Sequence, residues 1–205
     1  MPRRPASRPA AAPPAPAPSG ARPEVTPRGP RYWLVKTEPE TFSFEDLWAA
    51  PGRTTGWDGI RNYQARNFLR DDLRPGDGVL VYHSNATPSG VAGVAEVVAV
   101  GAPDPTQFDP RSPGFDPKAT RANPIWYQAE LRAVARAPRF LALEELRGLP
   151  GLAGMALLRR GQRLSVQPVT AEEWGIVLAA AGLGAPVATR AAAVRRPGPR
   201  ADRSR

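Results

Sequence analysis

The segment from Thr55 to Arg70 (TGWDGIRNYQARNFLR) concentrates aromatic, amide and guanidinium side chains. Trp57 offers a flat stacking surface, and Asp58 and Asn62 offer hydrogen-bonding groups close to it in the sequence. Together they suit a planar ligand with polar edges, such as a nucleobase. A tryptophan is more often a core residue, so the sequence leaves two environments open for Trp57.

A helix is predicted from about Arg61 to Leu73, and its two faces differ in chemistry. At about 100° per residue, one face carries apolar side chains and the opposite face carries polar ones. The apolar set is Ala65, Phe68, Leu69 and Leu73, and the polar set is Tyr63, Arg66, Asn67 and Arg70. Guanidinium groups match phosphate oxygens, so Arg61, Arg66, Arg70 and, further along the chain, Arg163 are expected phosphate contacts. A solvated helix face is the plainer alternative.

Polar residues also follow two predicted strands. Lys36, Thr37 and Glu38 lie at the exit of the first, and His83, Ser84 and Asn85 lie at the exit of the second. Polar strand ends line the mouth of a barrel, where they can supply donors and acceptors to one ring. A Ser–His dyad is not expected, because adjacent strand residues point to opposite faces. The chain contains no nucleophile elbow, phosphate-binding loop or dinucleotide fingerprint.

The elements that must position these residues alternate between strands and helices. Ser43 with Asp46, and Thr170 with Glu173, form capping boxes, and Gly182 ends the last helix. Six prolines between Gly101 and Pro124 are expected to exclude regular structure there. The predicted strands are Tyr32–Lys36, a short piece through Trp57, 78–84, Val91–Val100 and Ile125–Arg136; the other helices are 43–50, 141–149 and 170–182. This order predicts an α+β fold, a small mixed barrel with helices inserted between its strands.

One of these strands has a predicted orientation. In Ile125–Arg136, alternation places Tyr127, Ala129, Leu131 and Ala133 on the inward face. The same alternation places Trp126, Gln128, Glu130 and Arg132 on the outward face.

Composition excludes several classes of site. The 205 residues include no cysteine and one histidine, His83, so disulfides, thiolate catalysis and His-rich or Cys-rich metal sites are excluded. No apolar run reaches the roughly 18 residues needed to span a membrane. We therefore expect no metal, no cofactor and no membrane, and a cytoplasmic monomer, with association with the nucleoid as an option.

The net charge of +9 suggests an acidic partner, but it is unevenly distributed. Residues 1–31 and 183–205 carry about +5 each, and the rest is close to neutral. Residues 1–30 contain little besides Pro, Ala and Arg and cannot offset the entropy of ordering. We expect disordered tails at 1–30 and 183–205, with one domain between them at 31–182.

The ordered region resembles the EVE domain family, which belongs to the PUA-like superfamily alongside the YTH readers of methylated adenine in RNA. The matching motifs are long and colinear, and include YWLVKTEPETFSFEDL, TGWDGIRNYQARNFLR, GDGVLVYHSN and FDPKATRANPIW. The resemblance implies a pseudobarrel and a pocket for a flipped, modified base, with modified cytosine in DNA, such as 5-methylcytosine, as the leading candidate. It implies Trp57 as an aromatic wall, Lys36, Asn62 and Ser84 as polar lining, and Phe115 or Trp126 as a second wall.

The sequence therefore predicts a non-enzymatic reader of modified bases, in which Trp57 faces a base rather than the core. Its expected partner is nucleic acid, DNA rather than RNA. The expected pocket residues are Lys36, Thr37, Trp57, Asp58, Asn62, His83, Ser84, Asn85, Phe115 and Trp126. Alternatives are a binder of modified RNA, a scaffold for a partner protein, and a small hydrolase that uses Lys36 and Glu38 for acid–base work.

Overall fold

A computed structural model describes residues 31–184. The tails predicted at 1–30 and 183–205 therefore lie outside the described residues, apart from Leu183 and Gly184. Within residues 31–184, no helix is long and apolar enough to cross a membrane.

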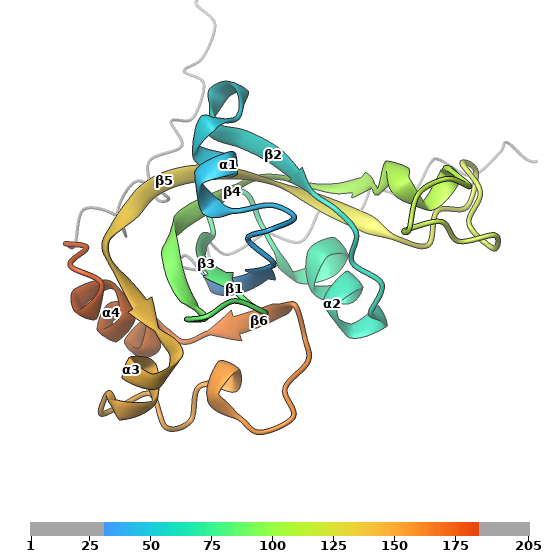
Figure 1. Ribbon diagram of the computed structural model, residues 1–205. Helices are drawn as coiled ribbons and strands as arrows, with labels where there is room; N and C mark the ends of the chain where they lie inside the picture. Colours follow the sequence, from blue (N-terminus) through green and yellow to red (C-terminus); the bar gives the residue numbers. More distant parts are fainter. Residues whose placement is uncertain (1–30, 185–205) are drawn as a thin grey trace, which may run out of the picture.

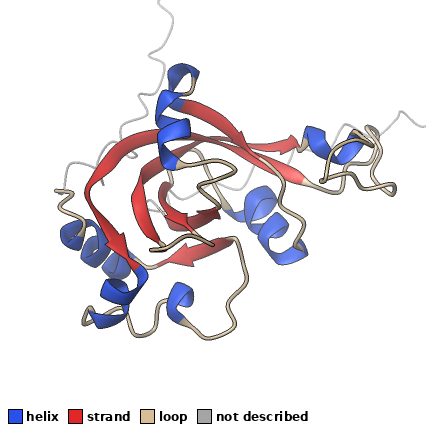
Figure 2. Cartoon of the chain, in the orientation of Figure 1, coloured by secondary structure: helices blue, strands red, loops and turns tan. Residues whose placement is uncertain are grey.

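Six strands form one mixed sheet that curls without closing (Figures 1 and 2). Their order is β2-β5-β4-β3-β1-β6, so β2 and β6 are the two edges. The β1–β3 pair is parallel and the other pairs are antiparallel. The strands are β1 (Tyr32–Thr37), β2 (Thr54–Trp57), β3 (Gly78–His83), β4 (Gly90–Pro103), β5 (Tyr127–Ala142) and β6 (Val166–Val169). The predicted α+β fold with a mixed pseudobarrel is confirmed.

The curl comes largely from β4 and β5, whose pairing shifts register at four points. Such bulges bend a strand and increase its twist. Both strands extend beyond their predicted C-terminal ends, β4 to Pro103 and β5 to Ala142. They extend because they pair with each other over this length, from Gly90 opposite Ala142 to Pro103 opposite Tyr127.

The prediction that prolines exclude regular structure after Gly101 is wrong. Pro103 lies beyond Glu96, the last β4 residue paired with β3, so its missing N–H breaks no ladder. Pro105 begins the 3-10 helix η3 (Pro105–Phe108), a position that tolerates proline.

Both faces of the sheet are covered, which gives two hydrophobic clusters. Along β3, Val79 and Val81 belong to the inner cluster, and Leu80 and Tyr82 belong to the outer one. The helices α1 (Phe44–Ala49) and α2 (Tyr63–Asn67) contribute to the inner cluster; α3 (Leu143–Gly148) and α4 (Ala171–Ala180) contribute to the outer one. Two further 3-10 turns are η1 (Pro51–Arg53) and η4 (Ala156–Leu158).

The inner cluster closes around Phe44, which is 1% exposed. Its ring lies so close to Gly93 on β4 that any side chain there would clash with it. A glycine at this position therefore lets α1 pack directly on the strand.

The predicted helix ends are largely correct. Both capping boxes form, at Ser43 with Asp46 and at Thr170 with Glu173. Gly182 follows α4 with a φ of 76°, as a C-terminal glycine requires.

The helix predicted from Arg61 to Leu73 starts later and changes type. The Asn62 side chain caps α2, and a π-helical turn, η2 (Phe68–Asp72), continues it. The predicted apolar face is confirmed by Ala65, Leu69 and Leu73, each 0% exposed.

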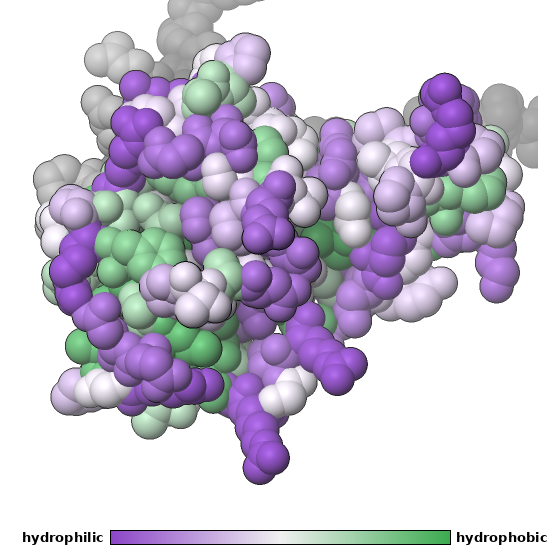
Figure 3. Space-filling model, viewed as in Figure 1, coloured by the Kyte–Doolittle hydropathy of each residue, from purple (hydrophilic) through white to green (hydrophobic). Residues whose placement is uncertain are grey.

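Residues 104–126 form an arm that projects from the curled sheet, beyond the ends of β4 and β5 (Figure 1). Hydrophilic residues cover much of the arm and the centre of the face in Figure 3. The apolar colour gathers mainly at the lower left, on the side where α3 and α4 lie.

Candidate functional site

A cavity of about 590 Å³ opens where the sheet fails to close. It is bordered by the end of β1, the end of β2 and the residue before β6, so it lies between the two edge strands. The lining residues are Lys36, Thr37, Thr41, Phe42, Thr55, Gly56, Trp57, Asp58, Gly59, Ile60, Arg61 and Ser165. The cavity thus brings together four of the predicted pocket residues and one predicted phosphate contact.

Trp57, the last residue of β2, both borders the cavity and belongs to the inner core. Its side chain is 6% exposed, and its ring packs edge-on against Phe42 at a centroid distance of 6.2 Å. The expectation that Trp57 faces a ligand and not the core is therefore wrong about the core, because Trp57 belongs to the core and borders the cavity as well. The indole packs within the inner cluster, and Trp57 also forms part of the cavity wall.

Two groups of opposite charge, Lys36 and Asp58, border the same cavity. The Lys36 ammonium donates to the carbonyl oxygen of Gln162 at 3.3 Å, and partial burial lowers its pKa. Partial burial, reinforced by the nearby charge of Asp104, raises the pKa of the Asp58 carboxyl. The site therefore offers a cationic donor and an anionic acceptor to one ligand.

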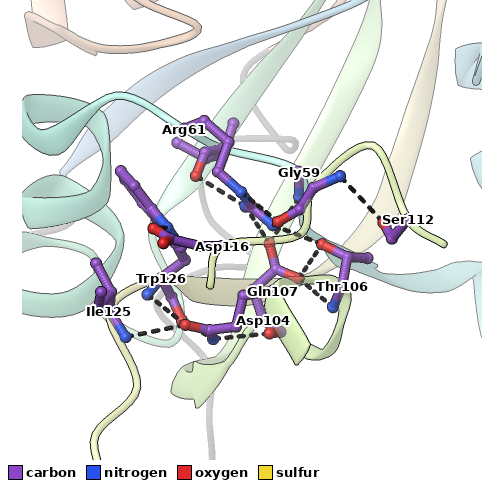
Figure 4. A network of polar contacts seen from close by, with 11 residues as sticks. Gly59, Arg61, Asp104, Thr106, Gln107, Ser112, Asp116, Ile125 and Trp126 are labelled. Carbon is purple, nitrogen blue, oxygen red and sulfur yellow. Dashed lines mark hydrogen bonds and ion pairs between the residues drawn. The ribbon is translucent and has the colours of Figure 1, made fainter. Parts of the chain in front are cut away.

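The arm is attached to the cavity wall through Asp104 (Figure 4). This carboxylate is fully buried and accepts hydrogen bonds from the Gly59 backbone N–H (2.9 Å) and the Arg61 guanidinium (2.7 Å). Thr106 donates to it through its N–H (2.8 Å) and its hydroxyl (2.6 Å). Burial opposes the ionisation of Asp104, but the hydrogen bonds outweigh it and lower the pKa.

Arg61 is committed to this attachment. Besides Asp104, its guanidinium contacts the Gly114 carbonyl oxygen (2.8 Å from Nε) and the Thr106 hydroxyl (2.7 Å). The side chain borders the cavity and is 25% exposed. The sequence predicts a phosphate contact for Arg61, but in this structure its donors serve the arm.

Gln107 organises the other side of the arm. Its fully buried amide accepts from the backbone N–H groups of Ile125 and Trp126, both at 2.9 Å. It donates to the carbonyl oxygens of Asp104 and Trp126, both at 2.8 Å. Figure 4 shows this amide between the two ends of the arm. Side-chain hydrogen bonds from Gln107 thus hold the two ends of the arm together.

The prediction that Trp126 lies on the outward face of a strand is wrong. Trp126 precedes β5, is 4% exposed, and donates through Nε1 to the Asp116 carboxylate at 2.8 Å. It does not border the cavity, and neither does Phe115, which is 39% exposed on the arm.

The polar residues at the end of β3 bond to the end of β1, the start of α1 and the segment between them, and do not line the cavity. His83 Nε2 accepts from the Phe44 N–H at 2.9 Å, and burial lowers the pKa of this imidazole. The Ser84 hydroxyl donates to the Thr37 carbonyl oxygen at 3.2 Å. Asn85 donates to the Glu38 carboxylate at 2.7 Å. None of the three borders the cavity.

Asn62 also lies outside the cavity lining. Its side-chain oxygen accepts from the N–H groups of Gln64 (2.9 Å) and Ala65 (3.1 Å), which begins α2.

The other three predicted phosphate contacts, Arg66, Arg70 and Arg163, differ in how far their guanidinium groups are already bonded within the protein. Arg66 donates to the Asn67 side-chain oxygen at 2.8 Å and lies over the Tyr63 ring. Arg70 forms a two-pronged pair with Asp71, with both contacts at 2.7 Å. Arg163 is exposed in the segment before β6. Arg66 on α2 and Arg70 on η2 come after the lining residues in the chain and do not border the cavity.

Sequence reasoning misses several lining residues, including Thr41, Phe42 and Ser165. Ser165 is next to Lys36 because β6 pairs with β1, and the Lys36 N–H donates to the Ser165 carbonyl oxygen at 2.8 Å. Phe42 lies in the family motif TEPETFSFEDL, where its position before a helix gives no sign of a lining role. Among residues 31–184, no three His, Asp or Glu side chains cluster closely enough to hold a metal ion.

Comparison with known proteins supports the family resemblance. A family model described as the EVE domain matches residues 31–180. Human thymocyte nuclear protein 1 is 43% identical over 165 residues, which cover 72% of each chain. Similar solved structures include a Pseudomonas syringae protein (43% identity, TM-score 0.69, covering 73% of this chain and 99% of that one). Another is the human THYN1 protein in complex with 5-methylcytosine containing DNA (39% identity, TM-score 0.69, covering 75% and 99%).

Proposed function

The chain belongs to the EVE domain family, and from that premise we propose that it is a non-enzymatic reader that holds a flipped, modified cytosine of DNA in the cavity beside Trp57. The observation that carries the proposal is this cavity, in which an aromatic wall and two opposite charges meet. Its volume of about 590 Å³ falls within the range of about 300–1,000 Å³ typical of small-ligand sites. The similarity to a protein solved with 5-methylcytosine containing DNA supports the choice of ligand.

The charges favour cytosine over thymine. Cytosine presents an exocyclic amine, which donates, beside a ring nitrogen and a carbonyl oxygen, which accept. In the proposed complex the Asp58 carboxylate accepts from the amine and the Lys36 ammonium donates to an acceptor. Thymine would place a carbonyl oxygen against Asp58, leaving two acceptors facing each other at a cost of about 1–3 kcal/mol.

Affinity for the polymer comes from other residues in this proposal. Arg66, Arg70 and Arg163 contact phosphates, which position the strand without reading its sequence. The arginines in the two terminal segments add a salt-sensitive attraction.

The test is a titration with duplexes that differ only in one central base: 5-methylcytosine, cytosine or thymine. The wild-type protein is expected to prefer 5-methylcytosine. Asp58→Asn should reduce the preference over thymine, because an amide presents both a donor and an acceptor. Glu144→Gln on α3, an exposed carboxylate on the opposite side of the sheet, is the matched control. An equal affinity of the wild-type protein for all three duplexes would disprove the proposal.

The hydrolase alternative receives little support from the geometry. Glu38 is exposed and bonded to Asn85, and it does not border the cavity that contains Lys36. Incubation with modified nucleosides and oligonucleotides, followed by mass spectrometry, should yield no product. A product that disappears with both Lys36→Ala and Glu38→Ala would favour the enzyme. The same titration with RNA carrying 5-methylcytosine separates a DNA reader from an RNA reader.

A further inference from the structure

Two large apolar side chains are notably exposed within residues 31–184: Tyr63 at 59% and Phe115 at 39%. Both flank Arg61, whose side chain borders the cavity. Tyr63 lies two positions after Arg61, and Phe115 follows Gly114, whose carbonyl oxygen accepts from Arg61 at 2.8 Å. Arg61 lies over the Trp126 ring (5.4 Å to the centroid), on which Tyr63 packs, so Tyr63 lies close to the cavity wall although neither exposed aromatic borders the cavity itself.

Tyr63 is held in place despite its exposure. Its ring lies on Trp126, with the centroids 4.9 Å apart and the planes inclined by 35°. The Arg66 guanidinium lies 4.7 Å from the ring centroid and is itself bonded to Asn67. An aromatic side chain fixed before binding loses little conformational entropy when it contacts a ligand.

The support beneath Tyr63 is rigidly joined to the cavity. The backbone of Trp126 is hydrogen-bonded on both its N–H and its carbonyl oxygen to the Gln107 amide, and its indole N–H donates to Asp116. The same arm reaches the cavity wall through Asp104 and Gly59. Figure 4 shows these contacts in one network. Hydrogen bonds, two of them buried, therefore connect the support of the Tyr63 ring to the cavity wall.

We propose that Tyr63 is a wedge that enters the base stack at the gap left by the extruded nucleotide. The inference rests on the proposed function. Extrusion of a base costs stacking energy on both sides of the gap, and proteins that open a stack commonly insert an apolar side chain there. Tyr63 meets the requirements of such a wedge: it is aromatic, it is largely exposed, and the Trp126 ring on which it packs belongs to an arm that is bonded to the cavity wall.

The test compares duplex and single-stranded DNA carrying the same 5-methylcytosine. A wedge replaces stacking only where a duplex stack has been opened. Tyr63→Ala should therefore weaken duplex binding by roughly 5- to 150-fold and leave single-strand binding unchanged. Tyr63→Phe should behave like the wild-type protein. Because Tyr63 is largely exposed, its replacement should leave the melting temperature nearly unchanged.

A second readout is 2-aminopurine placed beside the 5-methylcytosine. Its fluorescence should be higher in the complex with Tyr63→Ala than with the wild type, since the probe lacks a stacking partner. Equal weakening on duplex and single strand, or no weakening on duplex, would overturn the wedge. So would the duplex-specific loss appearing with Phe115→Ala instead. If the wild-type protein shows no preference for the modified base in either form, the proposed function fails, and the wedge fails with it.

Discussion

Asp104 on the arm accepts a hydrogen bond from the backbone N–H of Gly59 on the cavity wall, at 2.9 Å. The two residues are 45 positions apart in the chain. The carboxylate is fully buried and also pairs with Arg61. The Asp104 side chain therefore accepts from donors on the arm and on the cavity wall, and fixes the position of the arm relative to the cavity.

Replacing Asp104 is expected to be strongly destabilising. Asp104→Ala leaves the partly buried Arg61 cation and two backbone N–H groups without their acceptor, which should cost about 3–5 kcal/mol. Urea unfolding measures the loss. Asp109→Ala, which removes an exposed partner of Arg111, should cost far less than Asp104→Ala. Similar losses for the two variants would contradict the assigned role of Asp104.

Trp57 should be sensitive both in stability and in binding, because it is a core residue and a cavity wall. Trp57→Ala should cost about 3–5 kcal/mol of unfolding free energy. Trp57→Phe should remain folded but bind the modified base more weakly, since the stacking surface is smaller. Denaturant melts and oligonucleotide titrations of both variants separate the two roles. Unchanged binding by Trp57→Phe would mean that the indole serves only the core.

The raised pKa of Asp58 predicts a pH dependence of base binding. The carboxylate must be ionised to accept from the cytosine amine, so affinity should fall as the pH drops through this raised pKa, before an ordinary aspartate would titrate. A carboxyl whose pKa is raised in the folded state makes the fold more stable on protonation, so Asp58 itself does not cause acid unfolding. Titrations across the acid range should show this loss, and Asp58→Asn should abolish it. If the affinity of Asp58→Asn still falls at acid pH as it does for the wild-type protein, Asp58 does not contact the base.

The terminal segments should control salt dependence rather than selectivity. Residues 1–31 and 183–205 carry about +5 each. Deleting residues 1–30 and 185–205 should make the slope of log affinity against log salt shallower, by about 0.9 for each phosphate of duplex DNA that these segments neutralise in the full chain. The ratio of affinities for 5-methylcytosine and cytosine should stay the same. A changed ratio would show that these segments take part in reading the base.

How much of the molecule can be predicted depends on whether the information is local. The apolar face of α2 and both capping boxes follow from spacings of three or four residues, and these predictions are confirmed. The position of Trp57, Asp58 and Lys36 in the cavity lining also follows from local chemistry combined with the family motif.

The errors arise where distant segments meet. Ser165 borders the cavity because β6 pairs with β1, more than a hundred positions away. Trp126 is buried because Gln107 and Asp116 hold it, although alternation along the chain places it outside. His83 has the chemistry of a pocket residue, but its imidazole accepts from the first turn of α1. Polar residues at strand ends are used for loop attachment as readily as for ligands.

The position of the cavity between the edge strands β2 and β6 has a topological consequence. A closed barrel can be entered only at its two ends. An open seam accepts one protruding group from the side while the polymer on either side of it continues past. Under the proposed function, the protein therefore needs no free terminus on its DNA ligand, and covalently closed circular DNA should be as accessible to it as a linear fragment.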